Sequence, residues 1–133
     1  TVRGGVVADQ VGYGKTAITL GLIASQVGQS RLVGKGKAGG VKVPGAIRVG
    51  ATLVLAPPHL LKQWPNEVRK FTGDELNMEV INTAGDLNRL TIKRIQEVDL
   101  IVMASSVFRS EVYFERMAAL GGVSKQLAAT KLV

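Results

Sequence analysis

Apolar residues in this chain gather in four short runs that are nearly continuous rather than alternating with polar ones. The runs occupy residues 4–8, 51–56, 78–82 and 99–104, with the sequences GGVVA, ATLVLA, MEVIN and DLIVMA. Such runs are typical of parallel strands that are covered on both faces, because neither face then needs polar side chains. The pattern therefore predicts four strands of a parallel sheet.

Segments with the apolar period of a helix lie between these runs. The predicted helices span residues 15–27, 86–98 and 107–120. Asp86 is a good N-cap for the second helix, and Gly121 begins a glycine pair that ends the third. Strands that alternate with helices indicate an α/β fold, in which right-handed crossovers place flanking helices on a parallel sheet.

A fourth helix candidate, at residues 60–71, has its apolar residues on one side but contains Pro65. An interior proline costs roughly 3 kcal/mol, so we expect the helix to start or to kink at this residue. Trp64 lies on the apolar side, and we therefore interpret it as a core residue rather than as a platform for a stacked base.

The stretch from Gly28 to Gly50 breaks the alternation, since it holds seven glycines, five basic residues and Pro44 with little apolar periodicity. We expect a flexible surface insertion there. The net charge is +7, and the whole excess belongs to the part between Asp9 and Glu67, which contains no acidic residue. Such a basic field favours nucleic acid or phosphate ligands, although a solvated loop without a ligand explains it equally well.

Composition narrows the class of protein further. The chain has 133 residues, about one domain, and 46% of them are hydrophobic, which is typical of a globular protein. It has no cysteine and one histidine, so disulfides and cysteine-based zinc sites are excluded. No apolar run approaches the roughly 20 residues of a membrane span, and we expect a soluble intracellular protein. Because it starts at Thr1 and ends on TKLV, we expect a piece of a longer protein.

The segment ADQVGYGKT lies between the first predicted strand and the first predicted helix. A phosphate-binding loop needs small residues around the phosphates, a lysine, and a hydroxyl for Mg²⁺, all at a helix N-terminus. Gly12 and Gly14 supply the room, and Lys15 supplies the charge. Thr16 supplies the hydroxyl, but Asp9 replaces the first glycine of the usual pattern. The alternative is a glycine turn followed by an incidental Lys-Thr pair.

Hydrolysis of a bound triphosphate requires carboxylates that hold Mg²⁺ and orient water. Asp99 precedes its predicted strand instead of ending it, and Ser105 and Ser106 follow that strand. Glu111 and Glu115 lie one helical turn apart, which is typical of an exposed helix face. We therefore assign no catalytic residue in this chain.

Three segments together resemble the Swi/Snf class of superfamily-two helicase-like ATPases. GGVVADQVGYGKT is similar to motif I of that class, usually D-E-M-G-L-G-K-T, in which Asp also replaces the first Walker glycine. LVLAPPHLLKQWPNEVRKF is similar to motif Ia and its helix, with matching residues Pro57, Gln63, Trp64 and Glu67. DLIVMASSVFRS is similar to the motif Ib region. The resemblance spans about residues 3–112 and is strongest to fungal members.

The resemblance implies a P-loop, RecA-like lobe of a DNA translocase that uses ATP and Mg²⁺ in the nucleus, in chromatin remodelling or DNA repair. The implied nucleotide-binding residues, of which Thr16 also meets Mg²⁺ through ATP, are Asp9, Gly12, Tyr13, Gly14, Lys15 and Thr16. The implied contacts to the backbone of double-stranded DNA are Pro57, Pro58, His59, Ser105 and Ser106. Gln10 departs from the family, which commonly has Glu at this position.

The resemblance also implies that residues 1–133 are an incomplete first lobe, with residues 28–50 as a basic insertion. Motif II, the D-E-x-H box, does not occur in the chain, and neither does the second lobe. We therefore expect at most weak nucleotide binding by the chain alone, open sheet edges, and the rest of both lobes as partners.

A second interpretation stays open at this point. In it the chain is a non-catalytic, degenerate or truncated P-loop module that binds nucleic acid or a protein through its basic loop. A D-E-x-H sequence downstream would favour the motor over this module. A small nucleotide kinase is disfavoured because the chain has no arginine-rich lid. His59 is read as an exposed turn residue rather than as an acid or a ligand.

Overall fold

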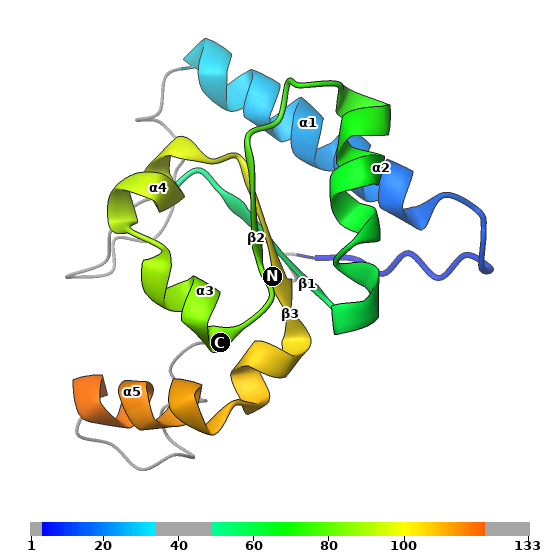
Figure 1. The fold of residues 1–133 in the computed structure, drawn as a ribbon. Helices are drawn as coiled ribbons and strands as arrows, with labels where there is room; N and C mark the ends of the chain where they lie inside the picture. The colour runs from blue at the N-terminus through cyan, green and yellow to red at the C-terminus, as the bar shows by residue number, and fades with distance from the viewer. Residues whose placement is uncertain (1–3, 34–48, 122–133) are drawn as a thin grey trace.

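The computed structural model describes residues 4–33 and 49–121. Its three strands, in the spatial order β1-β3-β2, are all parallel (Figure 1). They are β1 (Thr52–Ala56), β2 (Met78–Ile81) and β3 (Leu100–Ala104). The predicted α/β class and three of the four predicted strands are thereby confirmed.

The central strand β3 fixes the register of the sheet, because Leu100 aligns with Thr52 of β1 and with Met78 of β2. All five residues of β3 are buried, whereas β1 alternates, with Leu53 and Leu55 about half exposed. A strand between two neighbours has both faces and both edges covered. The edge strand β1 is paired only with β3, and the face that carries Leu53 and Leu55 is open, which agrees with the expectation of an incomplete sheet.

The prediction of a strand over residues 4–8 is wrong for this structure. Residues 4–10 have no regular secondary structure, and Val6 is 92% exposed. An apolar run shows that a segment is suited to burial, but a strand forms only where another strand pairs with it. No strand within residues 4–33 and 49–121 pairs with this segment.

Helix α1 (Lys15–Val33) follows the loop and has the predicted apolar face. Leu20, Ile23 and Val27 of this face are buried. The helix extends beyond the predicted end at residue 27, so residues 28–33 of the expected insertion are helical. The remainder of that insertion, residues 34–48, lies outside the described residues.

Pro65 lies in the first turn of α2 (Gln63–Thr72), which follows the short 3-10 helix η1 (Pro58–Leu60). A helix tolerates proline there, since the first backbone N–H groups have no acceptor within the helix. The expected start near this residue is therefore confirmed. Trp64 is partly buried against the core, which confirms its interpretation as a packing residue.

One predicted helix, residues 86–98, is two short helices in the structure, α3 (Ala84–Arg89) and α4 (Ile92–Glu97). Each has its own threonine N-cap, because Thr83 Oγ1 accepts the Asp86 N–H and Thr91 Oγ1 accepts the Arg94 N–H. Asp86 is therefore not the N-cap that the sequence predicted. Its carboxylate returns a bond to the Thr83 N–H and completes a capping box.

The chain beyond β3 forms a 3-10 helix, η2 (Ser105–Arg109), and then α5 (Glu111–Gly121). The predicted helix at residues 107–120 is thus confirmed in its second part, while its start belongs to η2. Tyr113 of α5 is buried and meets the rings of Phe108 and Phe114 edge to face.

Helices cover both faces of the sheet (Figure 1). Arg94 of α4 donates to Glu79 of β2 at 2.7 Å, and Glu79 shares its face with its β3 partner Ile101. The two crossovers run in opposite directions across the sheet, so right-handed connections place α2 on the other face. Helix α1 packs against α2, and Leu20 of α1 is fully buried in the core.

Candidate nucleotide-binding site

The loop before α1 is shaped by two glycines with positive φ. Gly12 has φ 89° and Gly14 has φ 78°, values that residues with side chains rarely adopt. A side chain at Gly12 would meet no atom within 4 Å, and one at Gly14 would meet only Ala17 at 4.0 Å. Backbone conformation, rather than lack of space, therefore requires glycine at both positions.

Lys15 ties this loop to the start of the helix. Its Nζ atom donates to the backbone carbonyl oxygens of Asp9 and Gln10, at 2.7 and 2.8 Å. The ammonium group thus stays beside the loop rather than extending into solvent. Asp9 and Tyr13 are exposed, Tyr13 by 70%. The structure therefore gathers all six predicted nucleotide-binding residues in and around one turn.

The N-terminus of α1 makes the electrostatics of this turn suitable for anions. The first backbone N–H groups of a helix lack acceptors within the helix and carry a partial positive charge. Lys15 adds a full charge, and the first turn of α1 contains no acidic residue that would compete with a phosphate. The arrangement can hold phosphates through backbone N–H groups and the lysine.

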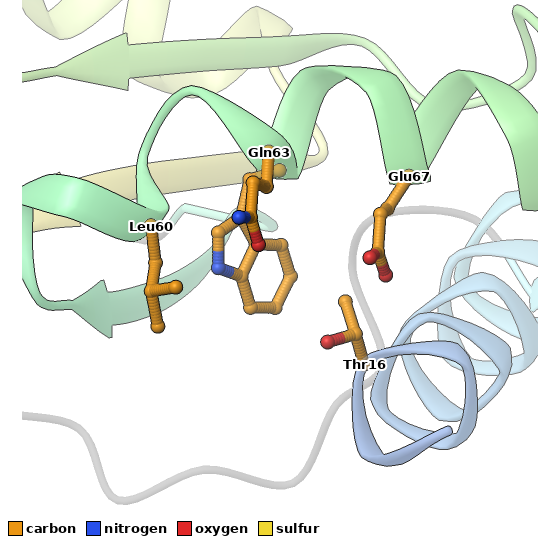
Figure 2. A pocket seen from close by; sticks show the side chains of 5 residues that line it. Thr16, Leu60, Gln63 and Glu67 are labelled. Carbon is orange, nitrogen blue, oxygen red and sulfur yellow. The ribbon is translucent and has the colours of Figure 1, made fainter. Parts of the chain in front are cut away.

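Thr16 connects the loop to a small pocket of about 100 Å³ between α1 and α2. The other residues that line this pocket are Leu60, Gln63, Trp64 and Glu67 (Figure 2). In the sequence analysis, Gln63 and Glu67 matched positions of motif Ia and its helix, and neither was assigned to the nucleotide site. Helical spacing could have shown that they share one side of α2, but only the packing of α1 on α2 brings Thr16 to them.

The expected DNA-contacting residues lie together at the carboxyl edge of the sheet. Ala56 and Ala104 are register partners at the ends of β1 and β3. The segment Pro57–His59 follows β1 and the pair Ser105–Ser106 follows β3, so neighbouring parallel strands bring the two segments to one edge. Apart from Ser105, which is half-buried, these residues are exposed and accessible to a ligand.

Within residues 4–33 and 49–121, no three His, Cys, Asp or Glu side chains are placed to hold an ion. Mg²⁺ needs no such cage, since it keeps several waters and binds through phosphates and one or two protein oxygens. The Thr16 hydroxyl beside the phosphate-binding loop suits this role. Thr16 would therefore hold the cation together with the phosphates of ATP.

Outside this site, the pKa values of one carboxyl group and one hydroxyl group are shifted. Hydrogen bonds from the Thr83 side chain and backbone lower the pKa of Asp86. Burial raises the pKa of the Tyr113 hydroxyl. Both belong to packing and capping, and neither faces the loop. Among the helices of the described ranges, none has the length and apolar character to cross a bilayer.

A parallel α/β sheet with a glycine loop that opens a helix defines a P-loop type of nucleotide-binding fold. The family model described as the SNF2-related domain matches residues 1–114. The chain belongs to this family, and the predicted Swi/Snf resemblance is confirmed. SNF2 ATPases generally use ATP and Mg²⁺ and act on DNA.

Two fungal relatives match nearly the whole chain. The chain is 43% identical over 125 residues to the protein named DNA (cytosine-5-)-methyltransferase DMT5 of Cryptococcus neoformans var. grubii. It is 29% identical over 123 residues to the protein of the same name from Verticillium dahliae. These matches cover 94% and 92% of the chain. The chain spans about 5% of the length of each relative.

Proposed function

We propose that this chain is the ATP- and Mg²⁺-binding part of a DNA-dependent ATPase that moves along double-stranded DNA in the nucleus. The observation that carries the proposal is the loop before α1. Gly12 and Gly14 adopt the positive φ values of a tight turn, and Lys15 is held beside it. Membership of the SNF2-related family supports ATP as the nucleotide.

DNA is the proposed second ligand. The residues Pro57–His59 and Ser105–Ser106 would contact its backbone with short polar groups and backbone N–H groups, which do not read bases. The names of both relatives, DNA methyltransferases, support DNA as the substrate of the longer protein. We propose chromatin remodelling or DNA repair as the process, and the rest of both lobes as the source of hydrolytic carboxylates.

Thermal melting with and without Mg²⁺-ATP tests the nucleotide site. A ligand that binds only the native state stabilises it by RT ln(1 + [L]/Kd), about 2.7 kcal/mol at a hundredfold excess over Kd. We expect ATP to raise the melting temperature of this chain. Lys15→Ala should abolish that rise, because it removes the ammonium group beside the loop.

Lys93→Ala is the matched control, since Lys93 is exposed on α4 and lies outside the loop. It should keep the full response to ATP. If the wild-type chain unfolds cooperatively and Mg²⁺-ATP leaves its melting temperature unchanged, the proposal is contradicted. That outcome would favour the non-catalytic module that binds nucleic acid or a protein through residues 28–50.

A further inference from the structure

The carboxylate of Glu67 lies beside the predicted phosphate-binding loop and has no role assigned to it so far. Glu67 extends from α2 toward Thr16 at the start of α1, across the pocket that both residues line (Figure 2). Among the described residues that line this pocket, Glu67 is the only Asp or Glu. The structure therefore brings an acidic group to the threonine that would meet Mg²⁺.

The packing of α2 on α1 places Glu67 on the side of α2 that lines the pocket. On α2, Glu67 follows Gln63 by four residues and Trp64 by three, so it lies on the same side of the helix as both. The next residue, Val68, is buried in the core, as is Leu20 on α1. Because the two helices pack against each other, the backbones that carry Glu67 and Thr16 are held side by side.

The polar groups of the pocket are available for a ligand. Within the described part of the chain, neither the Glu67 carboxylate nor the Thr16 hydroxyl makes a hydrogen bond or an ion pair. Thr19, in contrast, donates to the Lys15 carbonyl oxygen at 2.9 Å. Lys15 is directed to Asp9 and to the next carbonyl of the loop, and not to Glu67.

Glu67 is partly buried, and no group within the described part of the chain pairs with its carboxylate. A cation in the pocket would balance this negative charge. Free ATP would have the opposite effect, because its phosphates repel a nearby carboxylate. The same side chain therefore favours metal-bound nucleotide and disfavours metal-free nucleotide.

We propose that Glu67 is a positioning residue that makes the nucleotide site selective for Mg²⁺-ATP over free ATP. Its carboxylate accepts hydrogen bonds from waters that Mg²⁺ retains beside Thr16. The inference rests on the proposed nucleotide site, and it adds Glu67 of α2 to the residues of that site.

The test is a Mg²⁺ titration of nucleotide binding by this chain, followed with a fluorescent N-methylanthraniloyl derivative of ATP. In Glu67→Gln, the Mg²⁺ concentration for half-maximal binding should rise roughly tenfold, as when outer partners of a metal site are removed. Affinity in EDTA should stay the same or increase, because a negative charge is gone. Glu115→Gln, the same change on the exposed side of α5, should alter neither value.

An equal loss of affinity with Mg²⁺ and with EDTA would overturn the proposal, because a merely structural role predicts it. An unchanged Mg²⁺ requirement in Glu67→Gln would overturn it as well. If Glu67→Gln is unfolded at the temperature of the titration, Glu67→Asp replaces it. This variant should show a smaller rise in the Mg²⁺ concentration for half-maximal binding, and the absence of any rise would contradict the proposal. Failure of the nucleotide site itself is distinct, since wild type and Lys15→Ala would then bind equally little.

Discussion

At the scale of single residues, Gly12 and Gly14 show how a function can depend on backbone conformation. Neither position is crowded, so the reason for glycine is the positive φ of each residue. A residue with a side chain in this conformation costs roughly 1–2 kcal/mol. Because the loop is exposed and local, this cost falls on the proposed phosphate-binding conformation more than on the fold.

We expect Gly12→Ala to weaken ATP binding roughly tenfold, the factor that corresponds to about 1.4 kcal/mol. The fluorescent ATP titration measures this change. Gly5→Ala is the matched control, since Gly5 has no positive φ and an added side chain meets nothing within 4 Å. Equal affinities of the two variants would show that the loop does not require its left-handed turn.

At the scale of elements, α3 and α4 depend on their caps. Each is six residues long, too short for stability by itself, and each begins with a threonine that accepts a backbone N–H. In α3 the Asp86 carboxylate also accepts from Thr83 N, at 2.9 Å, and from Asn82 N, at 3.2 Å. The cap therefore closes the turn between β2 and α3.

This cap makes stability depend on pH in a defined direction. Bonds from Thr83 lower the pKa of Asp86 in the folded chain, so ionised Asp86 stabilises the fold above the usual aspartate pKa. The contribution is lost as pH falls through the lowered value. Asp86→Asn should be less stable than wild type near pH 7, and the difference should shrink in acid.

Urea unfolding of both proteins over this pH range measures the effect. Asp74→Asn, an exposed change outside any cap, should follow the wild-type pH profile. A constant difference between Asp86→Asn and wild type at every pH would contradict the role of the charge.

At the scale of the whole molecule, the order β1-β3-β2 decides which distant segments meet. The turn after β1 and the start of η2 are far apart in sequence, yet the register of Ala56 with Ala104 puts them at one edge. The proposed DNA-contacting surface therefore depends on the sheet rather than on either segment alone.

We expect Ser106→Ala to weaken binding of a DNA duplex roughly tenfold, since a hydrogen bond to a charged group contributes about 1.5–3 kcal/mol. The loss should be similar for two duplexes of unrelated sequence, because a phosphate contact does not read bases. Fluorescence anisotropy measures both affinities. Ser25→Ala, on the exposed part of α1, is the control and should bind like wild type. A loss confined to one duplex would point to base contacts instead.

Much of the fold could be predicted because its signals are local. Near-continuous apolar runs indicated β1, β2 and β3, and the glycine loop with Lys15 and Thr16 indicated the start of α1. The division into α3 and α4 escaped prediction, since Thr91 could belong to a helix interior or to a cap by sequence alone. The segment 4–8 has the composition of a strand, but composition does not supply a partner.

The sequence by itself determined most of the elements, the glycine loop and the residues suited to phosphate, since propensity, period and side-chain chemistry are properties of neighbouring residues. Only the tertiary structure decided which elements meet. It left residues 4–8 without a partner among the described strands, joined the turns after β1 and β3, and set Glu67 across a pocket from Thr16. Those outcomes depend on the packing of α1 on α2 and on the strand order, which are contacts between residues distant in the chain.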